Sequence, residues 1–250
     1  MVLLEVRGLR KSFDGIKALD DMSFTLEHSE IVGLIGPNGA GKTTLFNIVS
    51  GFLRSEGGSV CFNGMELRGT APHKVAAKGI GRTFQELRLA RSMTVIENLM
   101  LCFRTQPGEL LTNALCRPIL SSRVERQHRE RASHLLEQVR LQDKSEELAD
   151  ELSYGQQKAL SLMCCLATDS SLLLLDEPVA GVAPEMAADV LQIIHDLPRQ
   201  GKTVILIEHN MEAVSRVCER VIFMDAGRKV CEGTPDEVRN DPKVIEAYLA

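Results

Sequence analysis

A glycine-rich loop that directly follows a continuous apolar run constrains the fold of this chain more than any other feature. The run is Ile31–Ile35 and the loop covers residues 36–43. An unbroken apolar run predicts a strand buried on both faces, as in a parallel sheet covered by helices. Glycines allow the backbone N–H groups to converge on a phosphate, and the free amides of a following helix face the same anion. The pattern therefore predicts an α/β chain that binds phosphate.

The residue types of this loop predict individual contacts with a nucleotide. Lys42 can reach the β- and γ-phosphates, and the Thr43 hydroxyl can ligate Mg²⁺. A glycine-rich turn with an incidental lysine is the alternative, and the buried run before the loop argues against it. The predicted nucleotide-binding residues of the loop are Gly36, Pro37, Asn38, Gly39, Ala40, Gly41, Lys42, Thr43 and Thr44.

A second apolar run ends in two carboxylates. Residues 172–175 are four leucines, followed by Asp176, Glu177 and Pro178. Ligands of open α/β sheets bind beyond the carboxyl ends of the strands, and neighbouring residues of a strand point to opposite sides. Asp176 is therefore predicted to hold Mg²⁺, and Glu177 to polarise the water that attacks the γ-phosphate. A solvated strand end is the alternative interpretation.

A capped helix start lies just before the acidic strand, at Ser153, Tyr154 and Gly155. Ser153 is a good N-cap, and a helix start beside a glycine can receive a phosphate. The alternative is a well-capped helix with no ligand. Because the first loop already serves the nucleotide of this chain, we expect this helix start to contact a nucleotide held by another subunit.

The remaining pattern predicts one α/β core with an inserted helical lobe at residues 86–150. Strands are predicted over residues 2–6, 22–26, 60–62, Thr203–Ile207 and 221–224, and helices over residues 43–50, Pro184–Asp196 and 211–218, with a further helix beginning near residue 241. A capping box is predicted at Thr234 and Glu237. Residues 95–148 are mostly helical in pattern, with a loop or short-helix excursion at residues 104–122. Alternating strands and helices indicate a mostly parallel, covered sheet.

Composition excludes several classes of protein. The 250 residues are 44% hydrophobic and 25% charged with a net charge of -5, which does not favour nucleic acid as a partner. No apolar run approaches the ~18 residues of a membrane span, and Glu5 and Arg7 interrupt any signal-peptide pattern. A role at a membrane would therefore depend on other subunits. The seven cysteines show no C-x-x-C spacing and are predicted to be reduced packing residues.

Taken in order and spacing, these motifs resemble those of the nucleotide-binding subunits of ATP-binding cassette (ABC) transporters. The resemblance covers essentially the whole chain: residues 36–43 match the Walker A loop, 172–177 Walker B and 152–157 the signature motif. Gln85 matches the Q-loop glutamine and His209 the switch histidine, while Phe13 stands where an aromatic ring stacks on adenine. Residues 81–85, 93–99, 207–212 and 232–235 are similar to the ATPases of branched-chain amino acid importers. Related ATPases serve urea, short amides or other amino acids.

The resemblance implies a P-loop NTPase core with a mostly parallel sheet, an N-terminal antiparallel β subdomain and an inserted α-helical lobe. It implies a single nucleotide-binding domain over residues 1–250, in which 1–85 and 151–250 form the core. It also implies ATP and Mg²⁺ as cofactors. The implied catalytic residues are Glu177, His209 and Gln85, the metal ligands are Thr43, Gln85 and Asp176, and the nucleotide contacts include Phe13 and, for the partner's site, Ser153, Gly155 and Gln156.

The implied partners are a second ABC ATPase bound head to tail, identical or paralogous, two integral membrane permeases and, indirectly, a periplasmic or surface solute-binding protein. No nucleic acid is implied, and the expected location is the cytoplasmic face of the bacterial inner membrane.

Two residues depart from the usual family pattern: Tyr154 replaces a glycine of the signature, and Ala183 replaces an Asn or Asp that helps tie two sites together. Three alternatives stay open. They are a weakly hydrolysing regulatory cassette, an exporter of lipid or polysaccharide, and an ATPase that acts on nucleic acid, which would need a long coiled-coil insertion or two tandem cassettes.

Overall fold

The computed structural model describes residues 1–104 and 118–249, which divide into two compact units. The first unit comprises Met1–Arg82, Ser170–Glu177 and Leu191–Ala250, and the second comprises Thr83–Asp169 and Pro178–Val190. The expectation of a single nucleotide-binding domain with a helical lobe at residues 86–150 stays a prediction.

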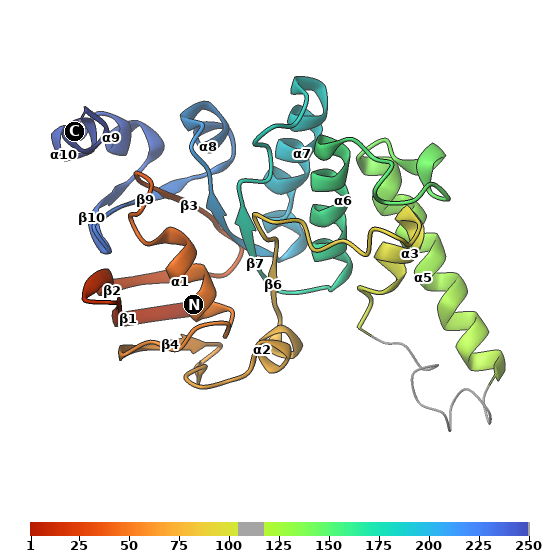
Figure 1. Cartoon of the computed structure of the whole chain (residues 1–250), viewed down its shortest axis with the longest axis horizontal. Coiled ribbons are helices and arrows are strands. Elements are labelled where there is room, and N and C mark those ends of the chain that lie inside the picture. The colour runs from red at the N-terminus through yellow and green to blue at the C-terminus, as the bar shows by residue number, and fades with distance from the viewer. Residues whose placement is uncertain (105–117, 250) are drawn as a thin grey trace. The chain divides into compact units, whose positions relative to one another are not determined.

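A six-stranded sheet forms the centre of the first unit, in the order β10-β9-β3-β8-β7-β6 (Figure 1). Neighbouring strands are parallel except for β9 and β10, which confirms the predicted mostly parallel sheet. The bounds are β3 Ile31–Ile35, β6 Ile80–Arg82, β7 Leu172–Asp176, β8 Thr203–Ile207, β9 Arg220–Asp225 and β10 Arg228–Gly233. Every residue of β3, β7 and β8 is buried, as their continuous apolar runs predict.

The register of this sheet brings the two phosphate-related motifs to one edge. Leu34 of β3 and Asp176 of β7 both pair with Ile207 of β8. The carboxyl ends of β3 and β7 therefore lie on either side of the end of β8. Parallel strands that end together form the ligand-binding edge of an open α/β sheet.

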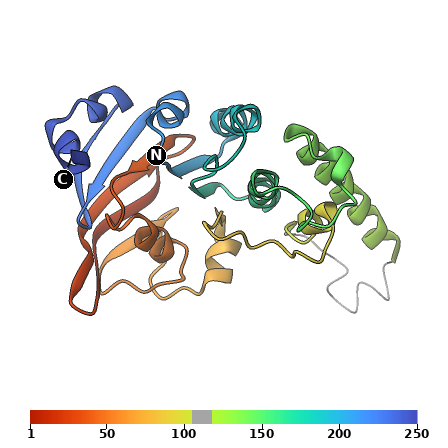
Figure 2. The ribbon, with the colours of Figure 1, turned by 45° about the horizontal axis from the view of Figure 1, so that its top comes forward.

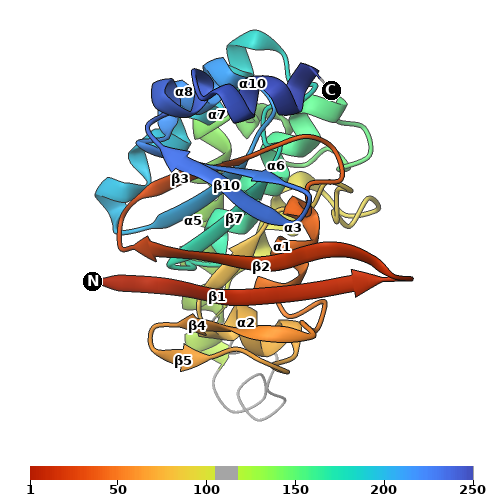
Figure 3. The same ribbon diagram turned by 90° about the vertical axis from the view of Figure 1, so that its left-hand side faces the viewer.

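A second, four-stranded antiparallel sheet in the order β2-β1-β4-β5 also belongs to the first unit (Figure 3). Its strands are β1 Val2–Phe13, β2 Ile16–Glu27, β4 Gly57–Phe62 and β5 Met65–Glu66. This confirms the antiparallel N-terminal β structure, but β1 and β2 are longer than the predicted residues 2–6 and 22–26. Charged residues such as Arg10 and Asp21 break the apolar pattern along the extra length, where backbone pairing continues.

Buried side chains of both sheets and of the helix α1 (Lys42–Val49) form one apolar core. The largest of them include Phe46 of α1 and Phe62 of β4. Burial of such side chains contributes about 1.5–3 kcal/mol each, so this core fixes α1 against the strands. The other helices of this unit are α2 Pro72–Lys78, α8 Met211–Val217, α9 Pro235–Arg239 and α10 Pro242–Leu249, with η3 at Pro198–Gln200.

The start of helix α9 has the predicted capping residues, whereas the start of α2 has no side-chain cap. Thr234 caps α9 with the predicted capping box: its Oγ1 accepts from the Glu237 amide at 3.4 Å, and Glu237 Oε2 accepts from the Thr234 amide at 2.8 Å. The short helix α2 was not predicted. It begins with Pro72 at its first turn but has no side-chain cap, so it lacks the strongest start signal.

The second unit is helical (Figure 2). It contains α3 Val95–Met100, α5 Pro118–Gln138, η2 Gln142–Lys144, α6 Tyr154–Ala167 and the start of α7, Pro184–Asp196, whose last residues belong to the first unit. Helices α3, α5 and α6 contact one another. The excursion predicted at residues 104–122 is wrong at its end, because α5 already begins at Pro118; its middle, residues 105–117, lies outside the described residues. No helix in the described part of the chain is long and apolar enough to span a bilayer.

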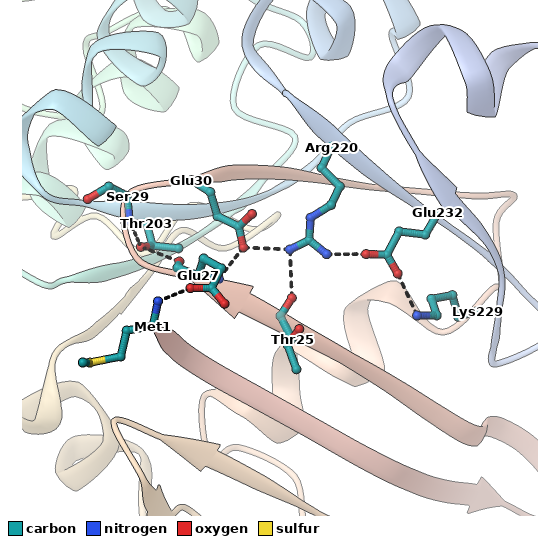
Figure 4. A network of polar contacts seen from close by, with 9 residues as sticks. All are labelled: Met1, Thr25, Glu27, Ser29, Glu30, Thr203, Arg220, Lys229 and Glu232. Atoms are coloured by element: carbon teal, nitrogen blue, oxygen red, sulfur yellow. Dashed lines mark hydrogen bonds and ion pairs between the residues drawn. The ribbon is translucent and has the colours of Figure 1, made fainter.

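A polar network around Arg220 joins the two sheets of the first unit (Figure 4). Arg220, on β9, donates to the Thr25 carbonyl at 2.8 Å and to Glu30 Oε1 at 2.7 Å, and its other terminal nitrogen pairs with Glu232. Burial alone would lower the pKa of Arg220, but the hydrogen bonds that it donates to Glu30 and Glu232 outweigh burial and raise the pKa. Lys229 Nζ completes the network on Glu232 at 2.7 Å.

We expect Arg220→Ala to lower the free energy of unfolding by about 2 kcal/mol, because it removes charge-assisted hydrogen bonds and leaves two carboxylates without their shared cation. Urea unfolding of the full chain measures this loss. The control is Arg10→Ala, whose side chain is 64% exposed and lies 3.5 Å from Asp21; its loss should stay below about 0.5 kcal/mol. Equal losses for the two variants would contradict the prediction.

Candidate functional site

The loop between β3 and α1 wraps around the side chain of Lys42. Lys42 Nζ donates to the carbonyl oxygens of Gly36 at 2.7 Å and Pro37 at 2.9 Å, and the residue is 7% exposed. Burial lowers the pKa of Lys42, while the nearby carboxylates of Glu177 and Asp176 act in the opposite direction. The ammonium is therefore positioned between the loop and the acidic strand end, as a phosphate-binding lysine requires.

Two glycines of the loop are required by close approach to neighbouring strands. A Cβ at Gly36 would overlap the carbonyl oxygen of Met224 on β9, and a Cβ at Gly41 would overlap that of Ala18 on β2. Their φ angles of 151° and 99° are also unfavourable for residues with a side chain. The loop is thus held between both sheets.

We expect Gly41→Ala to be more destabilising than Gly39→Ala. Both positions have positive φ, at 99° and 83°, but the space around a Cβ at Gly39 is open within 4 Å. Strain in φ costs about 1–2 kcal/mol in both variants, and the overlap with Ala18 adds about 1–3 kcal/mol for Gly41→Ala. Thermal or urea unfolding compares the two. A Gly39→Ala variant as unstable as Gly41→Ala would show that close approach is not the constraint.

The acidic strand end places its two carboxylates in different environments. Asp176 is the last residue of β7, and its side chain is 4% exposed, whereas that of Glu177 is 22% exposed. Glu177 has φ 48°, and its amide donates to the Ile207 carbonyl at 2.9 Å. A left-handed conformation is uncommon for a residue with a side chain, and such strain tends to occur at functional sites.

Glu177 and His209 meet at this edge of the sheet. His209 Nε2 lies 3.0 Å from Glu177 Oε1, and the two side chains follow the adjacent parallel strands β7 and β8. The sequence predicted both residues for the site but not their mutual contact. A histidine at this distance can hydrogen-bond the carboxylate and so orient it toward a reacting water.

The hairpin end between β1 and β2 carries an exposed apolar surface. Phe13 and Ile16 pair in register and are 46% and 75% exposed, and Lys11 Nζ lies 5.1 Å from the centroid of the Phe13 ring. β2 continues to Ala18, which packs against the phosphate loop at Gly41. A planar base could rest on this surface. The sequence identified Phe13 but not Ile16.

The other predicted site residues belong to the second unit. Ser153 and Gln156 form a capping box: Ser153 Oγ accepts from the Gln156 amide at 3.3 Å, and Gln156 Oε1 accepts from the Ser153 amide at 3.0 Å. This confirms Ser153 as the N-cap of α6. A Cβ at Gly155 would lie 3.3 Å from Cα of Val182, so the helix start packs closely on the segment after the acidic strand. Gln85 is exposed in this unit.

The oxygen groups near the loop fit a magnesium ion. Thr43, which is exposed in the first turn of α1, offers a hydroxyl, and Asp176 offers a carboxylate. Within the described residues, no group of three or more His, Cys, Asp or Glu side chains could hold a metal by itself. Mg²⁺ commonly takes one or two protein oxygens together with substrate phosphates and waters, so this sparse donor set suits it.

One buried residue near the site was missed from the sequence. Arg82 NH2 lies 4.0 Å from Asp176 Oδ2, and its NH1 donates to Asn47 and Ser50. These partners are far from Arg82 in sequence, so no local pattern could have indicated the contacts.

Comparisons with known proteins identify the family and the fold. Residues 19–180 match the family model "ABC transporter", and residues 228–249 match "Branched-chain amino acid ATP-binding cassette transporter". The chain is 38% identical over 248 residues to the high-affinity branched-chain amino acid transport ATP-binding protein BraF of Pseudomonas aeruginosa, covering 99% of this chain and 97% of the relative. It is 36% identical to the lipopolysaccharide export system ATP-binding protein LptB of Haemophilus influenzae, covering 100% and 98%. A nucleotide-free ATP-binding cassette from an ABC transporter has a TM-score of 0.84 at 33% identity, with both chains fully covered.

Proposed function

This chain belongs to the ABC transporter family as an ATP-binding cassette, and from that membership we propose that it hydrolyses ATP to power the uptake of branched-chain amino acids. The observation that most directly supports hydrolysis is the 3.0 Å contact between His209 and Glu177 beside the phosphate loop. Glu177 would orient or deprotonate the attacking water, and His209 would hold Glu177 and contact the γ-phosphate.

The remaining roles in the first unit follow from position. Lys42 and the loop amides would bind the phosphates, and Phe13 with Ile16 would support the adenine ring. Thr43 and Asp176 would hold Mg²⁺. The family resemblance, and not a position in this unit, implies Gln85 of the second unit as a further ligand. When bound, Mg²⁺ neutralises charge on the β- and γ-phosphates.

A second cassette would complete each site. The signature residues Ser153, Gly155 and Gln156 lie at the start of α6, where free amides and the helix dipole favour an anion. In a head-to-tail pair, these residues would face the γ-phosphate held by the loop of the partner. Loss of that phosphate would open the pair, and Gln85 would transmit the change to the helical lobe of a single nucleotide-binding domain.

Two permease subunits would anchor the pair at the cytoplasmic face of the bacterial inner membrane, and a periplasmic or surface binding protein would deliver the solute. The match of residues 228–249 to the branched-chain amino acid cassette model supports this substrate class. Overall identity does not separate import from export, because the importer and exporter relatives are similar to nearly the same degree. The segment with β10, α9 and α10 therefore carries the substrate proposal.

A weakly hydrolysing, regulatory cassette is the second candidate. It is motivated by Ala183, an exposed residue at the start of α7 whose side chain cannot form a hydrogen bond to a partner site. Steady-state ATP hydrolysis in the assembled transporter separates the two candidates, because a regulatory cassette would leave turnover to the other subunit.

We expect Glu177→Gln to retain ATP binding and to lose hydrolysis by about 10²–10⁴-fold, because the amide cannot accept the proton of the attacking water. Fluorescent-nucleotide binding and phosphate release, measured on the same preparation, test both parts. The variant should also trap a closed pair of cassettes, detectable by size-exclusion chromatography with ATP.

The matched variant Lys42→Ala should instead weaken ATP binding itself, because it removes the ammonium that reaches the phosphates. Unchanged hydrolysis in Glu177→Gln, or unchanged nucleotide affinity in Lys42→Ala, would refute the assigned roles.

For the transport activity, the chain is assembled with its cognate permeases and partner cassette and reconstituted in proteoliposomes. We expect ATP-dependent uptake of radiolabelled leucine in the presence of the cognate binding protein, and no uptake with Glu177→Gln. Uptake of urea or short amides in place of leucine would contradict the proposed substrate but would still support ATP-driven import. ATP hydrolysis without uptake of any of these solutes would contradict an import function.

A further inference from the structure

Arg82, the last residue of β6, bridges α1 and the acidic strand end. Its NH1 donates to Asn47 Oδ1 at 2.7 Å and to Ser50 Oγ at 2.8 Å. Its NH2 lies 4.0 Å from Oδ2 of Asp176. One guanidinium therefore contacts the helix that follows the phosphate loop and, on its other side, the carboxylate at the end of β7.

This bridge is buried. The side chains of Arg82 and Asp176 are 6% and 4% exposed, and the guanidinium carbon lies 5.6 Å from the ring centroid of Phe46. A carboxylate removed from water is costly unless a cation is close. Lys42 Nζ is hydrogen-bonded to two loop carbonyls, whereas Arg82 places a positive charge within ion-pair distance of Asp176. Arg82 thereby offsets part of the cost of burying this carboxylate.

The face of α1 that Arg82 contacts is the face that carries a proposed metal ligand. Thr43, Asn47 and Ser50 are spaced by four and then three residues along the helix and its C-cap, so they share one face. Thr43 lies at the start of this face, and Asp176 belongs to another element. The planar guanidinium of Arg82 hydrogen-bonds this face of α1 and at the same time places its positive charge beside the carboxylate of β7.

We propose that Arg82 is a positioning residue for the divalent metal, which sets the Thr43-bearing face of α1 against the Asp176 carboxylate. This inference rests on the proposed function and assigns a role to a residue outside the set proposed to bind the metal and the nucleotide. The 4.0 Å separation exceeds hydrogen-bond distance, so Arg82 acts on Asp176 through its charge while its hydrogen bonds hold α1. Mutation of residues that orient metal ligands commonly lowers metal affinity by about 10–100-fold.

The test measures metal binding apart from turnover, in the full-length chain. Mn²⁺ affinity is measured by electron paramagnetic resonance in the presence of a non-hydrolysable ATP analogue, and the affinity for trinitrophenyl-ATP is measured in EDTA. For Arg82→Gln we expect Mn²⁺ affinity to fall by about 10–100-fold, with the metal-free nucleotide affinity unchanged. A general loss of structure would weaken both.

Two further variants distinguish the effect of the Arg82 charge from the effect of its hydrogen bonds to α1. Arg82→Lys keeps a positive charge near Asp176 but loses the fork, so its loss of Mn²⁺ affinity should be smaller than that of Arg82→Gln. Asn47→Ala keeps the guanidinium and removes one anchor on α1, so it should also weaken Mn²⁺ binding, and less than Arg82→Gln. If Arg82→Gln does not fold, these two variants carry the test.

Unchanged or tighter Mn²⁺ binding in the Arg82 variants would overturn the inference, because Arg82 would then be neutral or would compete with the metal. If the metal-free nucleotide affinity fell as much as the Mn²⁺ affinity, the inference would also be overturned. Arg82 would then support the phosphate loop as a whole and not the metal ligands. These outcomes leave the proposed ATPase intact. That proposal fails separately if the unmodified chain binds neither trinitrophenyl-ATP nor Mn²⁺ with the analogue.

Discussion

The burial of the Asp176 carboxylate is the constraint on which the arrangement of the first unit depends. A carboxylate that is 4% exposed at the end of a central strand must be compensated by nearby positive charge. Arg82 provides it from β6, and Lys42 contributes from the phosphate loop. Each cation is itself fastened elsewhere, Lys42 to loop carbonyls and Arg82 to α1. Compensating one buried charge thus ties together the loop, α1 and two strands.

The same sheet edge explains why the side chain of Glu177 has different surroundings from that of Asp176. The chain leaves β7 in a left-handed conformation at Glu177, and the amide of this residue still bonds to Ile207 at the end of β8. The turn takes the Glu177 side chain out of the buried row and toward His209, which follows β8. Two adjacent carboxylates therefore reach different surroundings, one enclosed by cations and the other half-buried beside an imidazole. This division supports separate roles in metal binding and water activation.

The start of α6 differs from the phosphate loop, because its own side chains accept hydrogen bonds from its backbone amides. Ser153 and Gln156 cap each other, and Gly155 packs on the segment near Val182. This helix start can therefore bind a ligand through its remaining backbone amides and its helix dipole. The predicted nucleotide contacts of this chain therefore lie in two units, and we propose that a second copy or a paralogue completes each site.

The local sequence pattern predicted strands that are buried along their whole length and helices whose starts carry capping residues. The fully buried strands β3, β7 and β8 have continuous apolar sequences, and α6 and α9 begin with capping boxes that involve residues three apart. Prediction was less complete where pairing continued through charged residues, as in β1 and β2, or where an element was as short as β6. The start of α5 was placed too late, although Pro118 stands in its first turn, where proline is well tolerated.

The sequence by itself determined the phosphate loop, the acidic strand end and the capped helix start, because each depends on residues adjacent in the chain and on backbone rules that act locally. Only the tertiary structure decided that Glu177 meets His209, that Ile16 lies beside Phe13 at the hairpin end, and that Arg82 joins α1 to Asp176. Arg82 and Asn47 are separated by 35 residues, and β6, β7 and α1 approach one another only when the sheet forms. Contacts of this kind depend on strand order and register, and a local residue pattern specifies neither.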